Sequence, residues 1–376
     1  MSGLQEYSKS HTNQIVETLS DLVDLESFSD DKVGVDAVGA YVKNRLSHLG
    51  ASVETVSQRE RGDHLLATWG EGDGRALILC HMDTVWPSGT TQQRPFRVEG
   101  GRGLGPGVLD MKAGIAITIH AVEAIRDLGL TPSRSIRMLF SSGEEVGSPT
   151  SRSLIEEEAR KSNHVFCLEP AFGKEGALKT ARKGVGIFDI KVTGRAAHAG
   201  NDPENGVSAV EEMAHQVLRL HAMTDYSTGT TVNVGVINGG TVRNQIAPLA
   251  QALVDVRVFT TREAEKVSKS IMGLTTVHPE ASVEVTGGMN RPPLERTQET
   301  GRLFNAASDI AIRLGMELQE ARVGGGSDAQ FAAAVGIPVL DGLGGVGDGP
   351  HAEGEYVFLD SLHQRTALLA SLLVNL

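Results

Sequence analysis

Short apolar runs alternate with amphipathic segments along the first half of the chain. The apolar residues of 11–27 and of 34–49 recur at helical spacing, which predicts two amphipathic helices. A longer segment, Ala113–Leu128, is apolar nearly all round and is expected to be a buried helix. The runs expected to form strands are HLLATW (64–69), ALILC (76–80), IRMLF (136–140) and VFCL (165–168). Strands that alternate with helices indicate an α/β fold.

The pattern changes after Gly184. Residues 185–194 alternate between apolar and polar side chains, and the segments that follow are expected in the order βαββαβ. These segments are the strand 185–194, the helix 203–223, the strands 230–237 and 250–259, the helix 261–277 and the strand 282–285. This order is typical of a ferredoxin-like sandwich, here inserted into the first domain. The predicted division is 1–182 and 291–376 for the first domain and 183–290 for the inserted domain.

Composition and charge narrow the classes of function. The net charge of −12 would repel phosphate backbones and anionic lipid headgroups, so neither nucleic acid nor a membrane surface is expected as a partner. The first residues show no secretory signal, and no run of about 18 apolar residues occurs, so a cytoplasmic protein is expected. Cys80 and Cys167 lie inside apolar runs and are expected to be buried thiols without a chemical role.

Polar side chains directly follow three of the predicted strands. Because ligands bind at the carboxyl ends of strands in open α/β sheets, these side chains are expected to share one site. Asp110 precedes the buried helix, where its alternative role is a helix cap, and His351 lies in a glycine-rich loop. The polar residues at the strand ends are His81, Asp83, Glu144, Glu145 and Glu169.

Two imidazoles and three carboxylates from these segments suit two divalent ions that share one carboxylate. Two such ions carry more charge than three carboxylates neutralise, and the excess would stabilise a developing oxyanion, which indicates hydrolysis. Asp83 is expected to accept the other ring N–H of His81. Glu144 is expected to be the base that takes a proton from the attacking water. The five candidate ligands are His81, Asp110, Glu145, Glu169 and His351.

Three other motifs give weaker signals of a functional site than these ligands do. Gly103–Gly107 departs from the G-x-G-x-x-G pattern, so a dinucleotide site is not expected. The segment Gly324–Ala329 resembles a nucleophile elbow around Ser327 but lacks the second flanking glycine, and we interpret it as a substrate loop and helix cap. His215 and His221 do not share one face of their predicted helix, so we interpret them as surface or interface residues.

Stretches in order along nearly the whole chain resemble the zinc metallopeptidase family of glutamate carboxypeptidase (carboxypeptidase G type), acetylornithine deacetylase and succinyl-diaminopimelate desuccinylase. They are HMDTV (81–85), GPGVLDMKAG (105–114), SSGEEVGS (141–148), LEPA (168–171), GRAAHAG (194–200), NGGTVRNQIAP (238–248), GGGSDA (324–329) and GPHAEGE (349–355). The resemblance implies two Zn²⁺ per subunit, with Asp110 as the bridging ligand and Glu144 as the base. Co²⁺ and Mn²⁺ are alternatives for the same ligands.

The resemblance also implies an architecture. It is a zinc-binding α/β domain with a mixed sheet, interrupted by a smaller ferredoxin-like βαββαβ lid and dimerisation domain, so a homodimer is expected. His198 is expected close to a zinc site, in its own subunit or across the dimer, as an oxyanion donor. The alternative role of His198 is to cap the turn before Pro203.

Substrate-binding residues follow from the glutamate-releasing members of this family. In these members an arginine that leaves the lid domain and an asparagine of an N-x-I-x-P stretch bind the substrate carboxylate. The matching residues are Arg291, whose alternative role is a hinge charge, and Asn244, whose alternative role is a turn former. Arg257 and Gly326 complete the candidate substrate-binding residues.

Together these residues predict a zinc-dependent carboxypeptidase or amidohydrolase. Its substrate would be a small N-acyl amino acid, peptide or folate-like conjugate, from which it releases a C-terminal amino acid, with glutamate as one candidate. Ala177 and Lys179 stand where glutamate-releasing members carry a lysine and a serine, so the preference for glutamate is open. The alternatives are an N-acyl amino acid deacylase or dipeptidase and, in another class, a non-catalytic binding scaffold. The complete set of ligands and base argues against the scaffold.

Overall fold

The computed structural model describes residues 2–376, which form two compact units. The larger unit contains the chain up to Thr180, Arg296–Arg322 and Ser327–Leu376, and the smaller unit contains Ala181–Glu295 and Val323–Gly326. The sequence-based division places the smaller unit at 183–290 and leaves Val323–Gly326 in the larger one. The segment joins the smaller unit because its backbone carbonyls accept hydrogen bonds from Arg182 and Lys183.

The central sheet of the larger unit is mixed, as expected. Its strands are β1 (Ser52–Val56), β2 (His64–Trp69), β3 (Arg75–His81), β6 (Ser135–Ser141), β7 (His164–Cys167) and β14 (Val339–Leu340). They lie in the order β1-β2-β6-β3-β7-β14. β3 pairs in parallel with both β6 and β7, whereas β2 runs antiparallel to β1 and β6. The apolar runs of the sequence thus form the centre of the sheet.

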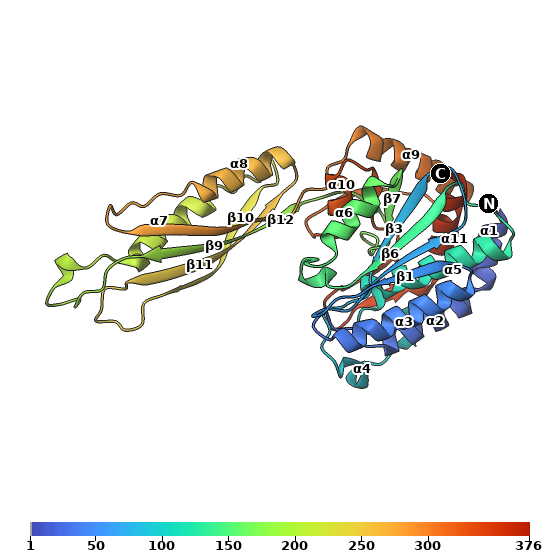
Figure 1. Ribbon diagram of the computed structural model, residues 1–376, viewed down its shortest axis with the longest axis horizontal. Helices are drawn as coiled ribbons and strands as arrows, with labels where there is room; N and C mark the ends of the chain where they lie inside the picture. The colour runs from blue at the N-terminus through green and yellow to red at the C-terminus, as the bar shows by residue number, and fades with distance from the viewer. Residues whose placement is uncertain (1) are drawn as a thin grey trace. The chain divides into compact units, whose positions relative to one another are not determined.

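Helices cover both faces of this sheet (Figure 1). On one face lie α2 (Thr12–Asp24), α3 (Lys32–His48) and α5 (Ala113–Asp127), and on the other lie α6 (Arg152–Arg160) and α10 (Ala329–Ala334). Helix α5 is almost entirely buried, which confirms the prediction from its apolar sequence. The remaining helices of this unit are α1 (Ser2–Ser10), α4 (Thr90–Gln93), α9 (Gln298–Arg313) and α11 (Leu359–Asn375).

Short strands form two further sheets. A four-stranded sheet has the order β15-β16-β5-β4, and β8 pairs with β13 in a two-stranded one. The four-stranded sheet is not among the elements that the sequence predicts. It holds together the loop after β5 and the loop between β15 and β16. The strands are β4 (Arg97–Glu99), β5 (Arg102–Leu104), β8 (Leu178–Arg182), β13 (Glu320–Val323), β15 (Gly347–Asp348) and β16 (Tyr356–Phe358).

The smaller unit has the βαββαβ order that the sequence predicts. Its elements are β9 (Gly184–Thr193), α7 (Ala209–His221), β10 (Thr231–Gly239), β11 (Leu249–Val258), α8 (Thr261–Met272) and β12 (Ser282–Arg291). The strands form an antiparallel sheet in the order β10-β11-β9-β12, the ferredoxin-like arrangement. Both helices cover one face of this sheet (Figure 1), so buried and exposed residues alternate along β9 and β11.

Two other predictions concern the chain as a whole. Cys80 and Cys167 are buried and form no disulfide, as expected. Among residues 2–376, no helix combines the length and the apolar character that crossing a membrane requires.

Candidate active site

Three strands of the central sheet end at the candidate site. His81 is the last residue of β3, the turn η2 (Glu144–Val146) follows β6, and Glu169 follows β7. His81 lies opposite Ser141 in the parallel pairing of β3 with β6. The carboxyl ends of these strands therefore meet at one edge, where the sequence analysis placed the site.

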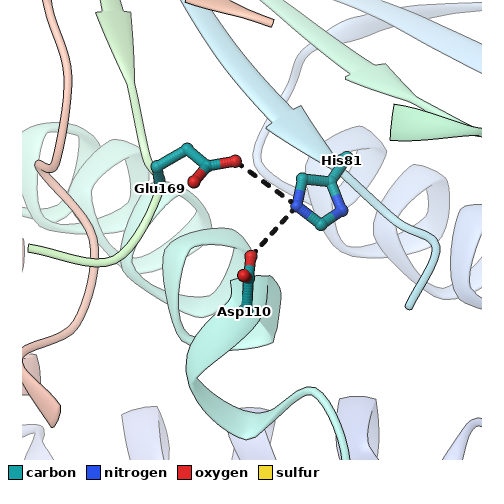
Figure 2. Close-up of side chains that lie close together, drawn as sticks. All are labelled: His81, Asp110 and Glu169. Atoms are coloured by element: carbon teal, nitrogen blue, oxygen red, sulfur yellow. Dashed lines mark hydrogen bonds and ion pairs between the residues drawn. The ribbon is translucent and has the colours of Figure 1, made fainter. Parts of the chain in front are cut away.

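The structure brings the five candidate ligands together in two groups. His81 Nε2 lies 3.2 Å from Asp110 Oδ1 and 3.5 Å from Glu169 Oε1 (Figure 2). His351 Nε2 lies 3.6 Å from Asp110 Oδ2 and 3.0 Å from Glu145 Oε2. In each group the ligand atoms are close enough together to hold one metal ion. Asp110 belongs to both groups, with one carboxylate oxygen facing each histidine.

The backbone around Asp110 explains how its side chain reaches both histidines. Asp110 lies in η1 (Val108–Lys112) but has extended torsion angles, φ −112° and ψ 94°, so the chain is kinked before α5 begins. The N-cap residue of α5 is Lys112, not Asp110, and its side chain makes no capping hydrogen bond. Gly114 lets α5 approach the end of β7, because a Cβ there would collide with the Leu168 carbonyl oxygen.

Asp83 accepts the second ring N–H of His81, as expected, and it does so through its backbone. The backbone carbonyl of Asp83, not its carboxylate, is the closer partner of His81 Nδ1, at 2.9 Å against 3.7 Å for Oδ1. Because a carbonyl only accepts, Nδ1 carries a proton, and Nε2 is the ring nitrogen that faces Asp110 and Glu169. The Asp83 carboxylate instead accepts hydrogen bonds from the backbone N–H groups of Glu144 and Glu145 and from Ser29 Oγ. It therefore fixes the turn that carries the predicted base.

The electrostatics of the site favour a positive charge between the carboxylates. Burial lowers the pKa of His81, but Asp110 and Glu169 outweigh it and raise that pKa well above its usual value. Asp110 and Glu145 raise the pKa of His351 to about 10. Burial would raise the pKa of Asp110, but hydrogen bonds from His351 and His81 hold it well below its usual range. Burial also raises the pKa of Glu145 to about 7.

Glu355 is a site residue that the sequence analysis missed. Its side chain is buried, and its carboxylate accepts hydrogen bonds from the backbone N–H groups of Gly107, Leu109 and Asp110 and from Trp86 Nε1. It lies within the stretch GPHAEGE, but a glutamate in a glycine-rich loop carries no signal of this role.

Asp328 is a second residue with an unpredicted contact. It stands at the N-cap position of α10 without capping the helix through its side chain. Its carboxylate instead accepts hydrogen bonds from Ser141 Oγ, at 2.8 Å, and from Ser148 Oγ. The expected helix cap thus binds both ends of the segment that contains Glu144 and Glu145.

The predicted substrate-binding residues belong to the smaller unit. Arg257 lies on β11 and Arg291 on β12, the two strands that flank β9. Both pair with Val185 of β9 and therefore lie on the same face of that sheet. Arg257 also pairs with Asp255, with Nε 2.9 Å from Oδ1. The Gly326 carbonyl accepts a hydrogen bond from Arg182 Nη1 at 2.7 Å. Asn244 lies in the exposed loop between β10 and β11.

His198 lies beside Asn244, because the Asn244 carbonyl accepts the Ala199 N–H. His198 Nδ1 accepts hydrogen bonds from the backbone N–H groups of Gly200 and Asn201, at 3.1 and 2.9 Å. The turn-capping alternative is therefore present in the structure. It leaves the other nitrogen available, since a neutral ring whose Nδ1 accepts carries its proton on Nε2.

Comparisons with known proteins place this geometry in context. Residues 77–375 match the peptidase family M20/M25/M40. The chain is 32% identical over 96% of its length, and 89% of the relative's, to carboxypeptidase G2 from Pseudomonas sp. (strain RS-16). It is 31% identical to acetylornithine deacetylase from Pasteurella multocida (strain Pm70), over 57% of this chain and 59% of that one. A solved structure of a dinuclear metal-binding M20 peptidase from Bacillus subtilis matches its fold with a TM-score of 0.71 and 17% identity, covering 97% of this chain and 98% of that one.

Proposed function

Because the chain belongs to the peptidase family M20/M25/M40, we propose that it is a two-metal carboxypeptidase that releases a C-terminal amino acid from an N-acyl or folate-like conjugate. Family membership makes it a hydrolase of amide or peptide bonds. The observation that carries the proposal is the position of Asp110. Its two carboxylate oxygens face two different histidines, each of which has a second carboxylate beside it.

The donor atoms fit two Zn²⁺ ions, with Co²⁺ or Mn²⁺ as alternatives. His81, Asp110 and Glu169 would hold one ion, and Asp110, Glu145 and His351 the other. Glu145 Oε1 is buried without a hydrogen-bond partner among the described residues, which suits an atom that binds a cation. When bound, the ions would polarise the scissile carbonyl group and lower the pKa of the attacking water. The dinuclear B. subtilis peptidase supports two ions rather than one.

Glu144 is the proposed general base. The residue is only 8% exposed, and its backbone N–H donates a hydrogen bond to the Asp83 carboxylate, so its side chain projects from a fixed turn. In the proposed reaction Glu144 takes a proton from the attacking water and returns it to the amine that leaves. Asp83 supports this step through the turn and orients His81 through its backbone carbonyl.

Residues of the smaller unit are proposed to bind the substrate. Arg291 and Asn244 would bind its free carboxylate, and Arg257 and Gly326 would complete this subsite. His198 would donate a hydrogen bond from Nε2–H to the oxyanion that forms as the amide carbon becomes tetrahedral. The two backbone hydrogen bonds to Nδ1 support this role, because they fix both the tautomer and the ring.

The identity of the substrate is the finer part of the proposal. Similarity to carboxypeptidase G2 over nearly the whole chain supports a carboxypeptidase. The resemblance to glutamate-releasing members makes glutamate the first candidate for the released amino acid. The alternative is an N-acyl amino acid deacylase or dipeptidase, which the similarity to an acetylornithine deacetylase supports. Ala177 and Lys179 also support this alternative, because they stand where glutamate-releasing members carry a lysine and a serine.

A substrate panel tests the choice between these two. The panel varies the acyl group with glutamate held constant, and then varies the amino acid with the best acyl group held constant. A carboxypeptidase of the proposed kind depends more strongly on the released amino acid than on the acyl group. The opposite dependence would favour the deacylase.

The proposal also covers catalysis, assembly and location. The protein acts as a catalyst rather than a binding scaffold, and chelation should remove both metal and hydrolysis, which added Zn²⁺ restores. Retained hydrolysis in metal-free protein would contradict the metal site. We also propose a homodimer, which sedimentation analysis would check, and a cytoplasmic location, which fits two buried cysteines, Cys80 and Cys167, that form no disulfide.

A further inference from the structure

Glu355 occupies a position between two loops that carry candidate ligands. It immediately precedes β16, four residues after His351, and it reaches across to η1, where Asp110 lies. Only 1% of its surface is exposed. Neither carboxylate oxygen belongs to the candidate ligand groups. The side chain thus lies behind the site rather than in it.

Both carboxylate oxygens of Glu355 accept two hydrogen bonds. Oε1 accepts the backbone N–H groups of Leu109 and Asp110, each at 2.9 Å. Oε2 accepts the Gly107 N–H at 2.9 Å and Trp86 Nε1 at 3.0 Å. All four partners are donors, so the pocket suits an acceptor-only carboxylate. A glutamine would place an NH₂ group against two N–H donors.

These contacts set the backbone from which the Asp110 side chain projects. Asp110 has extended torsion angles inside η1, so its own N–H and that of Leu109 depend on Glu355 as their acceptor. His351, in the loop that Glu355 ends, has a left-handed backbone with φ 63°. The hairpin of β15 and β16, with β5 beside it, fixes the ends of that loop. One carboxylate therefore links the loops of the shared ligand and of His351.

We propose that Glu355 is a positioning residue for the metal pair, which holds the Asp110 carboxylate so that each oxygen faces one histidine. This inference rests on the proposed two-metal site. Because Asp110 is shared, displacing it would weaken the binding of both ions, whereas displacing an unshared ligand would weaken mainly one. Weaker binding of both ions together, in a protein that still folds, is therefore the result that distinguishes positioning from a purely structural role.

The test measures metal binding to protein from which a chelator has removed all metal. Binding is monitored by the absorption of Co²⁺ and by titration with Zn²⁺, at a temperature well below unfolding. In Glu355→Gln we expect both ions to bind about 10- to 100-fold more weakly than in the wild type, the range found for outer residues that orient ligands. Glu353→Gln, in the same loop but exposed, is the matched control and should bind as the wild type does. Glu355→Asp, which keeps the charge and loses reach, should give an intermediate loss.

The outcomes separate the inference from the proposed function. If folded Glu355→Gln binds both ions with wild-type affinity, even at a lower melting temperature, then Glu355 is merely structural and the inference is wrong. If Glu355→Gln does not fold, Glu355→Asp decides by the same criterion. If the wild type itself binds no metal, the proposed function fails and the inference fails with it. Weaker binding of both ions in the Glu355 variants, with wild-type binding in Glu353→Gln, supports the positioning role.

Discussion

Glu144 and Glu145 are neighbours in one short turn, yet their side chains have different surroundings. Glu145 Oε2 lies 3.0 Å from His351 Nε2, whereas Glu144 belongs to neither candidate ligand group. We therefore predict that Glu144→Gln keeps both metals and loses about 10²- to 10⁴-fold in kcat, the usual contribution of a general base. Glu145→Gln should lose metal as well. Metal analysis and steady-state kinetics on both variants check this.

Each of the two variants is the control for the other, because both remove one negative charge from the same turn. Equal metal loss in both variants would show that base and ligand have been assigned wrongly. A normal kcat in Glu144→Gln would remove Glu144 from the reaction.

At the scale of single residues, the sequence could predict the ligands but not the residues that hold them. His81 and Glu169 were predictable because they end or follow apolar runs, and the edge of a sheet brings such ends together. Glu355 was not, because its partners Gly107 and Trp86 lie 248 and 269 positions away along the chain. The contact of Asp83 with His81 was predictable from their spacing, but the accepting atom was not, since spacing does not distinguish a backbone carbonyl from a carboxylate.

Strand β7 begins with a buried histidine that makes the stability of the central sheet depend on pH. Burial, together with the positive charge of Arg134, lowers the pKa of His164 to about 4 from an unfolded value of 6.5. Between these values the unfolded chain binds the proton more readily than the folded one. The contribution of His164 is thus complete above pH 6.5 and is lost as pH falls through 4. The loss amounts to about 3 kcal/mol.

Urea unfolding at pH 7.5 and pH 5 measures this effect. His164→Leu removes the titrating group and keeps an apolar contact for Phe166, whose ring lies 4.7 Å from the imidazole. We expect the free energy of unfolding to fall less between the two pH values in the variant than in the wild type. Equal losses in both proteins would mean that His164 does not contribute.

Asp328 gives a prediction for the segment between β6 and α6. Its carboxylate binds Ser141 Oγ and Ser148 Oγ, on either side of the proposed base. Asp328→Asn replaces one of these acceptors with a donor, so the free energy of unfolding should fall by about 1–3 kcal/mol and kcat should fall more than KM rises. Asp309→Asn, at an exposed position of α9, is the control and should stay within about 0.5 kcal/mol. Unchanged kcat and stability in Asp328→Asn would exclude this role.

At the scale of elements, hydrophobic periodicity predicted the long, regular helices and strands. The helix α5 and the six elements of the smaller unit were predictable, because each repeats its pattern over enough residues. The sheet of β15, β16, β5 and β4 was not, because its strands are only two or three residues long and show no period. That sheet holds the loops of Asp110 and His351, so strands too short to predict position two of the five candidate ligands.

At the scale of the whole molecule, the two units carry different groups of candidate residues. The candidate ligands all belong to the larger unit, and the proposed substrate-binding residues to the smaller unit. If both sets act on one substrate, chemistry and recognition are separable by mutation. Changes in the smaller unit should then leave the metal content unchanged and alter selectivity between substrates.

Arg291, at the end of β12, offers the sharpest test of this separation. A planar guanidinium can bind a carboxylate through two parallel hydrogen bonds, which a lysine cannot, and such a pair contributes about 2–4 kcal/mol when shielded from water. Arg291→Lys should therefore lower kcat/KM for free-acid substrates about 30- to 1000-fold, with metal content unchanged. Amidated substrates, which lack the carboxylate, should change little. Arg262→Lys, at an exposed position of α8, is the matched control. Equal effects on both substrate classes would make Arg291 a hinge residue, and the carboxypeptidase proposal would then give way to a general amidase.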